Sequence, residues 1–77
     1  MILGCGEYLN NIDFKHNDVS FHENIQSADA CNKICKDHDA FSWDTPSNSY
    51  FQQVCWCKNS NYEENVTFED HVISGKV

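Results

Sequence analysis

Hydrophobic and polar residues alternate with a period of two in three stretches of the chain, residues 12–14, 40–44 and 52–58. In the third stretch, Cys55 and Cys57 fall on one side, and Trp56 falls on the other. A period of two is typical of a β-strand that buries one face. We therefore predict a strand in each stretch, and a last apolar segment at Val72 and Ile73.

A helical spacing follows Ser27, whose hydroxyl suits the N-cap position of a helix. Residues of one face then recur at i, i+3, i+4 and i+7, as Cys31, Ile34, Cys35 and His38. This spacing predicts a helix of about ten residues that closes near His38. Polar composition predicts irregular connections elsewhere, at residues 15–26, 45–49 and 59–65.

The order of these elements indicates an α+β fold in which one helix packs on a twisted antiparallel sheet. A chain of 77 residues forms a single domain, residues 1–77, and a core of this size commonly needs disulfide staples. The apolar opening, Met1-Ile2-Leu3, is too short for a signal peptide. We therefore expect a fragment of a longer secreted or cell-surface protein, with the signal peptide outside this fragment.

The chain is strongly acidic, with twelve Asp and Glu residues, five Lys residues, no Arg and a net charge of −7. This charge disfavours nucleic acid, heparin-like polyanions and acidic membrane surfaces as partners. No apolar run reaches the roughly 18–20 residues of a membrane span, so direct membrane insertion is not expected. The acidic pairs lie in polar loops and the serines form no nucleophile motif, so we predict no enzymatic activity and no cofactor or metal.

Four of the five cysteines form two pairs, and we expect the two cysteines of each pair to be separated by a similar distance in space. Cys31 and Cys35 lie about 6 Å apart, one turn along the predicted helix, and Cys55 and Cys57 have nearly the same spacing on a strand. Two bridges fit between helix and strand. If these run parallel, Cys31 pairs with Cys55 and Cys35 with Cys57; the crossed pairing stays open for a reversed helix. Cys5 is then unpaired.

The same four cysteines could instead supply thiolates to zinc in an intracellular domain. The usual zinc knuckle separates two cysteines by two residues, whereas these pairs are separated by three residues and by one. The chain also lacks the Cys-x-x-Cys motif of a redox centre. We keep zinc binding as an alternative to disulfide formation.

Several motifs occur in a recognisable order: Cys5, Ile12-Asp13-Phe14, Ser27-Ala28-x-x-Cys31-x-x-x-Cys35, Phe41-x-Trp43, Cys55-Trp56-Cys57-Lys58 and Ile73-Ser74-Gly75. Together they resemble the PAN/apple domain, including the apple domains of microneme adhesins from apicomplexan parasites, over nearly the whole chain. The resemblance implies a twisted antiparallel sheet that cradles one helix. It also implies a module that binds proteins or glycans and catalyses no reaction.

The sequence departs from the family pattern in its cysteines. Apple domains usually carry a third cysteine just after the helix, paired with the second helical cysteine, and residues 36–40 contain none. Cys57 stands where the family usually has an aliphatic residue and could replace that partner. Apple domains also often pair the N-terminal cysteine with one near the C-terminus, so Cys5 either stays unpaired or pairs beyond Val77.

Candidate ligand-binding residues flank the predicted turn at 45–49: Trp43, Asp44, Tyr50 and Phe51. Aromatic rings stack on the apolar faces of neutral sugars, and exposed aromatic side chains also suit protein hot spots. Trp43 could equally be a core side chain, and Trp56 is expected to fill the sheet face opposite the disulfides. Asn65-Val66-Thr67 is a glycosylation sequon in a polar loop.

The sequence thus favours a non-enzymatic extracellular adhesion or recognition module. Its expected partner is an extracellular or host-cell-surface protein, or a neutral glycan such as galactose. The alternatives are a structural spacer or self-association module within a longer adhesin, and the intracellular zinc-binding domain.

Overall fold

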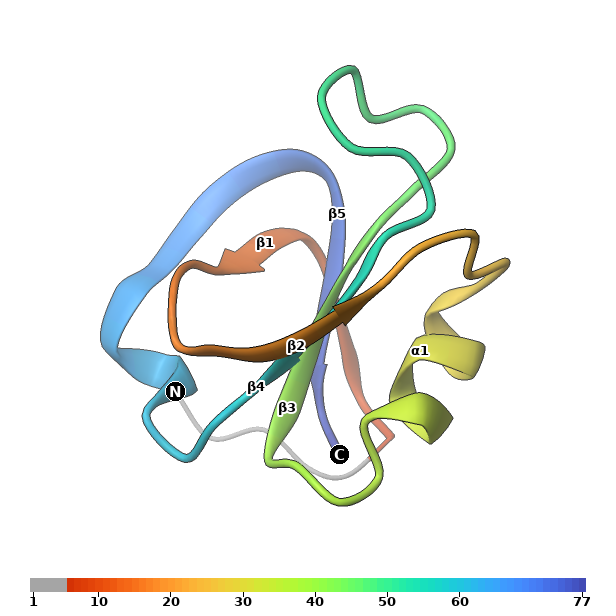
Figure 1. The fold of residues 1–77 in the computed structure, drawn as a ribbon. Helices are drawn as coiled ribbons and strands as arrows, with labels where there is room; N and C mark the ends of the chain where they lie inside the picture. The colour runs from red at the N-terminus through yellow and green to blue at the C-terminus, as the bar shows by residue number, and fades with distance from the viewer. Residues whose placement is uncertain (1–5) are drawn as a thin grey trace.

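The computed structural model describes residues 6–77, which form a five-stranded antiparallel sheet with an α-helix packed on it (Figure 1). The strands are β1 (Tyr8–Phe14), β2 (Asp18–His22), β3 (Ala40–Asp44), β4 (Cys55–Lys58) and β5 (Val66–Lys76), and the helices are α1 (Ala28–Ile34) and the 3₁₀ helix η1 (Tyr62–Asn65). Along the sheet the order is β1-β5-β3-β4-β2. The predicted α+β class is confirmed.

Helix α1 begins where the sequence predicted and ends earlier. The Ser27 hydroxyl accepts a hydrogen bond from the backbone N–H of Ala30 at 3.0 Å, as an N-cap side chain does. The helix stops at Ile34, with Cys35 as its C-cap. His38 therefore lies beyond the helix, because only a few residues remain after Cys35 for the chain to reverse into β3 at Ala40.

Two disulfides join α1 and its C-cap to β4: Cys31 to Cys55, and Cys35 to Cys57. The Cα–Cα distance is 5.3 Å in each bridge. These are the bridges predicted for a helix and strand that run parallel. All four cysteines are fully buried. The bridges therefore hold the helix flat against the middle of the sheet.

Strand β2 corrects the prediction of an irregular connection at residues 15–26. Residues 18–22 pair antiparallel with β4 and form one edge of the sheet. The apolar side chains of this strand, Val19 and Phe21, are 50% and 57% exposed. Strand β2 has no buried apolar face and joins the sheet by backbone pairing with β4. Its sequence therefore lacks the alternation of buried apolar and exposed polar residues by which a strand is predicted.

The first half of β5 leaves the main sheet together with the end of β1. Strand β3 pairs with β5 only from Val72 onward, whereas Val66–Phe68 pair with Ile12–Phe14. At the bend, Asn11 and His71 adopt positive φ angles of 60° and 62°. The Asn11 side-chain oxygen accepts a hydrogen bond from the His71 N–H at 3.1 Å. We call residues 12–14 and 66–70 the β1–β5 arm.

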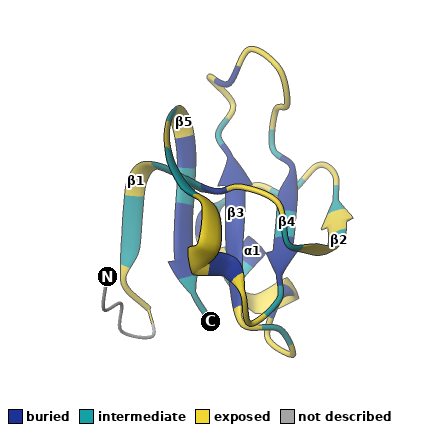
Figure 2. Ribbon diagram, turned by 90° about the vertical axis from the view of Figure 1, so that its left-hand side faces the viewer, coloured by how far each residue is buried: buried dark blue, intermediate teal, exposed yellow. Residues whose placement is uncertain are grey.

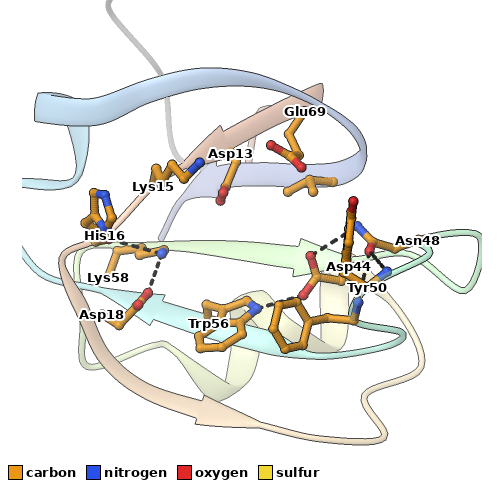
Figure 3. Close-up of a pocket in the computed structure, with 12 residues that line it drawn as sticks. Asp13, Lys15, His16, Asp18, Asp44, Asn48, Tyr50, Trp56, Lys58 and Glu69 are labelled. Atoms are coloured by element: carbon orange, nitrogen blue, oxygen red, sulfur yellow. Dashed lines mark hydrogen bonds and ion pairs between the residues drawn. The ribbon is translucent and has the colours of Figure 1, made fainter.

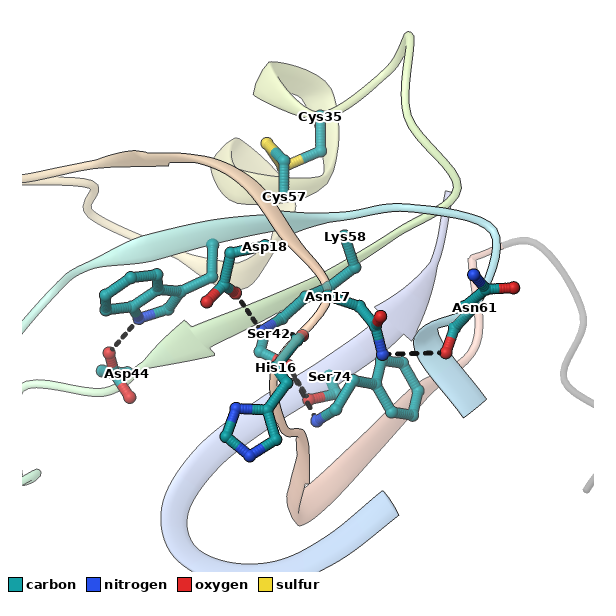
Figure 4. A network of polar contacts seen from close by, with 12 residues as sticks. His16, Asn17, Asp18, Cys35, Ser42, Asp44, Cys57, Lys58, Asn61 and Ser74 are labelled. Carbon is teal, nitrogen blue, oxygen red and sulfur yellow. Dashed lines mark hydrogen bonds and ion pairs between the residues drawn. A yellow bond between two sulfur atoms is a disulfide. The ribbon is translucent and has the colours of Figure 1, made fainter. Parts of the chain in front are cut away.

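Two buried serines fasten the base of this arm to β3 (Figure 4). The Ser42 and Ser74 hydroxyl oxygens lie 2.7 Å apart. Ser74 donates to the Ile12 carbonyl at 2.6 Å, and Ser42 accepts from the Phe14 N–H at 3.1 Å. A hydrogen-bonded polar network of this kind fixes one register between the strands that it joins.

The buried side chains lie on both faces of the sheet. Between the sheet and α1 lies a cluster of Ala28, Phe41, Trp43 and the four bridged cysteines. On the other face, Phe14 and Ala40 pack with Tyr62, which comes from the segment predicted as a polar loop. Strand β3 is buried along its whole length between these clusters (Figure 2).

Candidate functional site

A pocket of about 290 Å³ opens on the sheet face that points away from α1, beneath the β1–β5 arm (Figure 3). It is lined by Asp13, Lys15, His16, Asp18, Asp44, Asn48, Tyr50, Phe51, Trp56, Lys58, Glu69 and Val72. We call it the sheet-face pocket. Its volume suits a monosaccharide or a single amino-acid side chain, since pockets for larger ligands generally measure about 300–1,000 Å³.

Three of the four predicted ligand-binding residues line this pocket, and the fourth does not. Asp44, Tyr50 and Phe51 are lining residues. Trp43 is only 6% exposed, packs in the core under α1, and donates its indole N–H to the Ile25 carbonyl at 2.9 Å. Adjacent strand residues point to opposite faces, so Trp43 cannot share a ligand with Asp44.

The indole that does line the pocket belongs to Trp56. Its side chain lies on the sheet face opposite the disulfides, as the alternation in β4 predicted, and it is partly exposed. The Trp56 ring lies between two aromatic neighbours, with centroids 5.4 Å from Phe21 and 5.5 Å from Phe51. Such spacings are typical of favourable aromatic pairs, and of these rings Trp56 and Phe51 line the pocket and form its apolar wall.

Asp44 lies at the base of the pocket and is 6% exposed. Its carboxylate accepts a hydrogen bond from the Trp56 indole N–H at 2.7 Å. Burial raises the pKa of Asp44 from its ordinary value to about 6, against the opposing effect of that hydrogen bond. The carboxylates of Asp13 and Glu69 raise this pKa further, and Lys58 lowers it.

Asn48 holds the loop that carries the exposed aromatic rings. It is 6% exposed, and its side-chain oxygen accepts the backbone N–H groups of Tyr50 at 2.9 Å and Phe51 at 3.0 Å. Its amide nitrogen lies 3.5 Å from the Asp44 carboxylate and 3.4 Å from the His71 carbonyl, as a donor to both. From the sequence, we predicted this asparagine only as part of the turn at residues 45–49.

Tyr50 and Phe51 are 84% and 52% exposed at the mouth of the pocket. Two neighbouring aromatic side chains with this much free surface at the edge of a pocket suit contact with a ligand. The backbone next to them is anchored by Asn48, so these rings are presented on a defined loop. This preorganisation lowers the entropy cost of binding.

Lys58 is occupied within the fold. It is 3% exposed, donates to the His16 carbonyl at 3.1 Å, and forms an ion pair with Asp18. Its ammonium group also lies 5.9 Å from the centroid of the Trp56 ring. This ion pair neutralises Asp18 within the pocket lining.

The cysteines do not form the alternative zinc site. In residues 6–77, the group of side chains close enough to hold a metal is Cys31, Cys35 and Cys55, and each of these is bonded to another cysteine. A cysteine in a disulfide has no thiol left to ionise, so it supplies no thiolate ligand. Cys5 lies outside the described residues.

The glycosylation sequon lies away from the pocket lining. Asn65 is the last residue of η1 and is exposed. Its carbonyl accepts the Lys15 backbone N–H at 2.9 Å, while its side chain stays at the surface. In the described part of the chain, no helix is long and apolar enough to cross a membrane.

A comparison of the chain with models of known protein families found no match, and neither did a search of curated protein sequences.

Proposed function

We propose that this protein is a non-enzymatic extracellular recognition module of the PAN/apple type, which binds a protein or a neutral glycan at the sheet-face pocket. The observation that carries the proposal is the pair of exposed rings, Tyr50 and Phe51, on a loop anchored by Asn48 beside the buried Asp44 carboxylate.

Several further features support this proposal. The order and spacing of the sequence motifs resemble apple domains, and the disulfide-braced sheet with one helix agrees with the fold that the resemblance implies. Disulfides form and persist mainly in oxidising compartments, which favours secretion or display at the cell surface. The exposed Asn65 sequon is compatible with that environment.

The chemistry of the pocket suits a small polar ligand with an apolar face. An aromatic wall offers a stacking surface, and the carboxylates of Asp13, Asp44 and Glu69 can accept hydrogen bonds from ligand hydroxyl groups. Sulfated glycans and nucleic acids need clustered cations. Of the two lysines that line the pocket, Lys58 is already occupied, so we do not expect polyanions to bind there.

Two-dimensional NMR of the ¹⁵N-labelled domain, titrated with galactose and other neutral monosaccharides, tests the proposal for glycans. We expect shifts at Asp44, Tyr50, Phe51 and the Trp56 indole N–H. The Tyr50→Ala variant should bind more weakly and remain folded, whereas Ile34→Ala, on α1, should bind like the unchanged domain. Failure of every pocket residue to respond, to sugars and to the peptide-like probes described below, would contradict the proposed function.

A further inference from the structure

We propose that the sheet-face pocket binds the side chain of a lysine or arginine presented by a partner protein. This inference rests on the proposed recognition function and names the chemistry of the ligand. It follows from two properties of the pocket: its charge and its aromatic wall.

The charge of the pocket favours a cation. Four carboxylates and two lysines line it, which leaves a charge of −2 with histidine neutral. Asp18 and Lys58 neutralise each other, so the charge of −2 comes from three carboxylates set against the exposed Lys15. The remaining carboxylates come from three different strands: Asp13 from β1, Asp44 from β3 and Glu69 from β5.

Two of these carboxylates, Asp13 and Glu69, act on the third, Asp44. Asp13 and Glu69 lie on the β1–β5 arm, and Figure 3 shows both above Asp44, on the opposite side of the open space. All three line the same pocket, and the negative charges of Asp13 and Glu69 both raise the pKa of Asp44. A cation between the arm and the sheet would relieve this repulsion, because opposite charges at a few ångströms stabilise the ionised carboxylates.

The aromatic wall accommodates the same group. Ammonium and guanidinium groups are attracted to the faces of Trp, Tyr and Phe rings, while the aliphatic stems of lysine and arginine pack on apolar surface. The Lys58 ammonium already lies over the Trp56 ring. The more exposed rings of Tyr50 and Phe51 stand at the mouth, where an incoming side chain would pass.

Other cations and other occupants fit less well. The carboxylate oxygens of the pocket do not form a tight group of three or more potential metal ligands, since the only such group in residues 6–77 consists of cysteines. A site with spread carboxylates and aromatic rings suits an organic cation better than a metal ion. A second copy of the chain carries the same charge of −7 and is repelled.

Matched small probes test the inference on the intact 77-residue domain. Nα-acetyl-lysine methyl ester carries the ammonium group, and Nα,Nε-diacetyl-lysine methyl ester is nearly the same molecule without the charge. In NMR titrations at pH 7.5 and low salt, we expect the charged probe to shift Asp44, Phe51 and the Trp56 indole N–H. Its dissociation constant should be at least about fivefold lower than that of the neutral probe, and the advantage should shrink in 0.3 M salt.

Two double variants separate pocket charge from total charge. Asp13→Asn with Glu69→Gln should raise the dissociation constant of the charged probe at least about fivefold. Glu23→Gln with Asp37→Asn changes the net charge equally at two exposed positions outside the pocket lining, and should change binding less than twofold. Circular dichroism spectra of both variants would show that each remains folded.

Each alternative outcome has a distinct meaning. Equal affinity for the charged and neutral probes, or equal loss in both double variants, would overturn the cation inference. Pocket shifts with neutral monosaccharides but not with the charged probe would also overturn it, while leaving the proposed recognition function intact. Concentration-dependent shifts at the pocket without any probe would identify a second copy of the chain as the occupant and overturn the inference.

Discussion

Reduction of the two disulfides should unfold this domain at ordinary temperature. The bridges span sequence separations of 24 and 22 residues. In the chain-entropy model, one bridge of this span stabilises the fold by about 3.4 kcal/mol. The second bridge closes only a small additional loop of about eight residues, because its cysteines lie beside those of the first, and contributes about 2.5 kcal/mol.

The sum of about 6 kcal/mol is large for a domain of this size. At about 0.05–0.15 kcal/mol per residue, a chain of 77 residues has a total stability of about 4–12 kcal/mol. A loss of about 6 kcal/mol lowers the melting temperature of a small domain by about 24–48 °C. The helix would then detach, because its buried face consists mainly of the bridged cysteines and Ala28.

Thermal melts followed by far-ultraviolet circular dichroism, with and without a phosphine reductant at pH 7, measure this effect. The same melts on a Cys5→Ser variant control for disulfide exchange through Cys5. Partial reduction should trap a folded species with one bridge, since the first bridge to break costs less than the second. A cooperative melt within about 10 °C of the oxidised protein, after complete reduction, would refute the argument that the bridges hold the fold together.

Three further changes test other parts of the structure. Gly75→Ala would place a methyl group 2.8 Å from a ring carbon of Phe41, and overpacking of this kind should cost about 1–3 kcal/mol in urea melts; a cost below about 0.5 kcal/mol would contradict the close packing. Asn48→Ala should lower the hydrogen-exchange protection of the Tyr50 and Phe51 amides at least tenfold, whereas Ser49→Ala, at an exposed position of the same loop, should leave it unchanged. Because the pKa of Asp44 is raised to about 6, the folded state binds the extra proton, so stability should fall as the pH rises from about 4 to 6; Asp44→Asn should weaken this fall, and an unchanged pH profile would argue against the raised pKa.

Local rules predicted the features that depend on neighbours in sequence. The N-cap at Ser27 follows from the chemistry of one side chain. The spacing of the cysteines on a helix and a strand allowed a parallel and a crossed pairing, and the structure has the parallel one that we predicted. The alternation in β3 also predicts that the Trp43 side chain points to the core and not to the pocket. Adjacent strand positions face opposite ways, so Trp43 and Asp44 should not have been grouped in one site.

Features that depend on contacts between residues far apart in the chain could not be predicted from the sequence. Strand β2 keeps Phe21 exposed and is recognised only through its backbone pairing with β4. The pocket needs the β1–β5 arm, whose bend depends on Asn11 and His71, 60 positions apart in the chain. Asp13 and Glu69 therefore read as ordinary solvated acids in sequence, and only the fold brings them to the same pocket as Asp44.

The side chains on the two faces of β4 have different roles. Cys55 and Cys57 point to the helix and hold the domain together, while Trp56, between them, points to the pocket. A substitution at the middle position changes the binding surface without touching either sulfur bridge. The covalent frame on one face therefore leaves the other face free to vary, and a library built on Tyr50, Phe51 and Trp56 could be selected for new ligands on an unchanged scaffold.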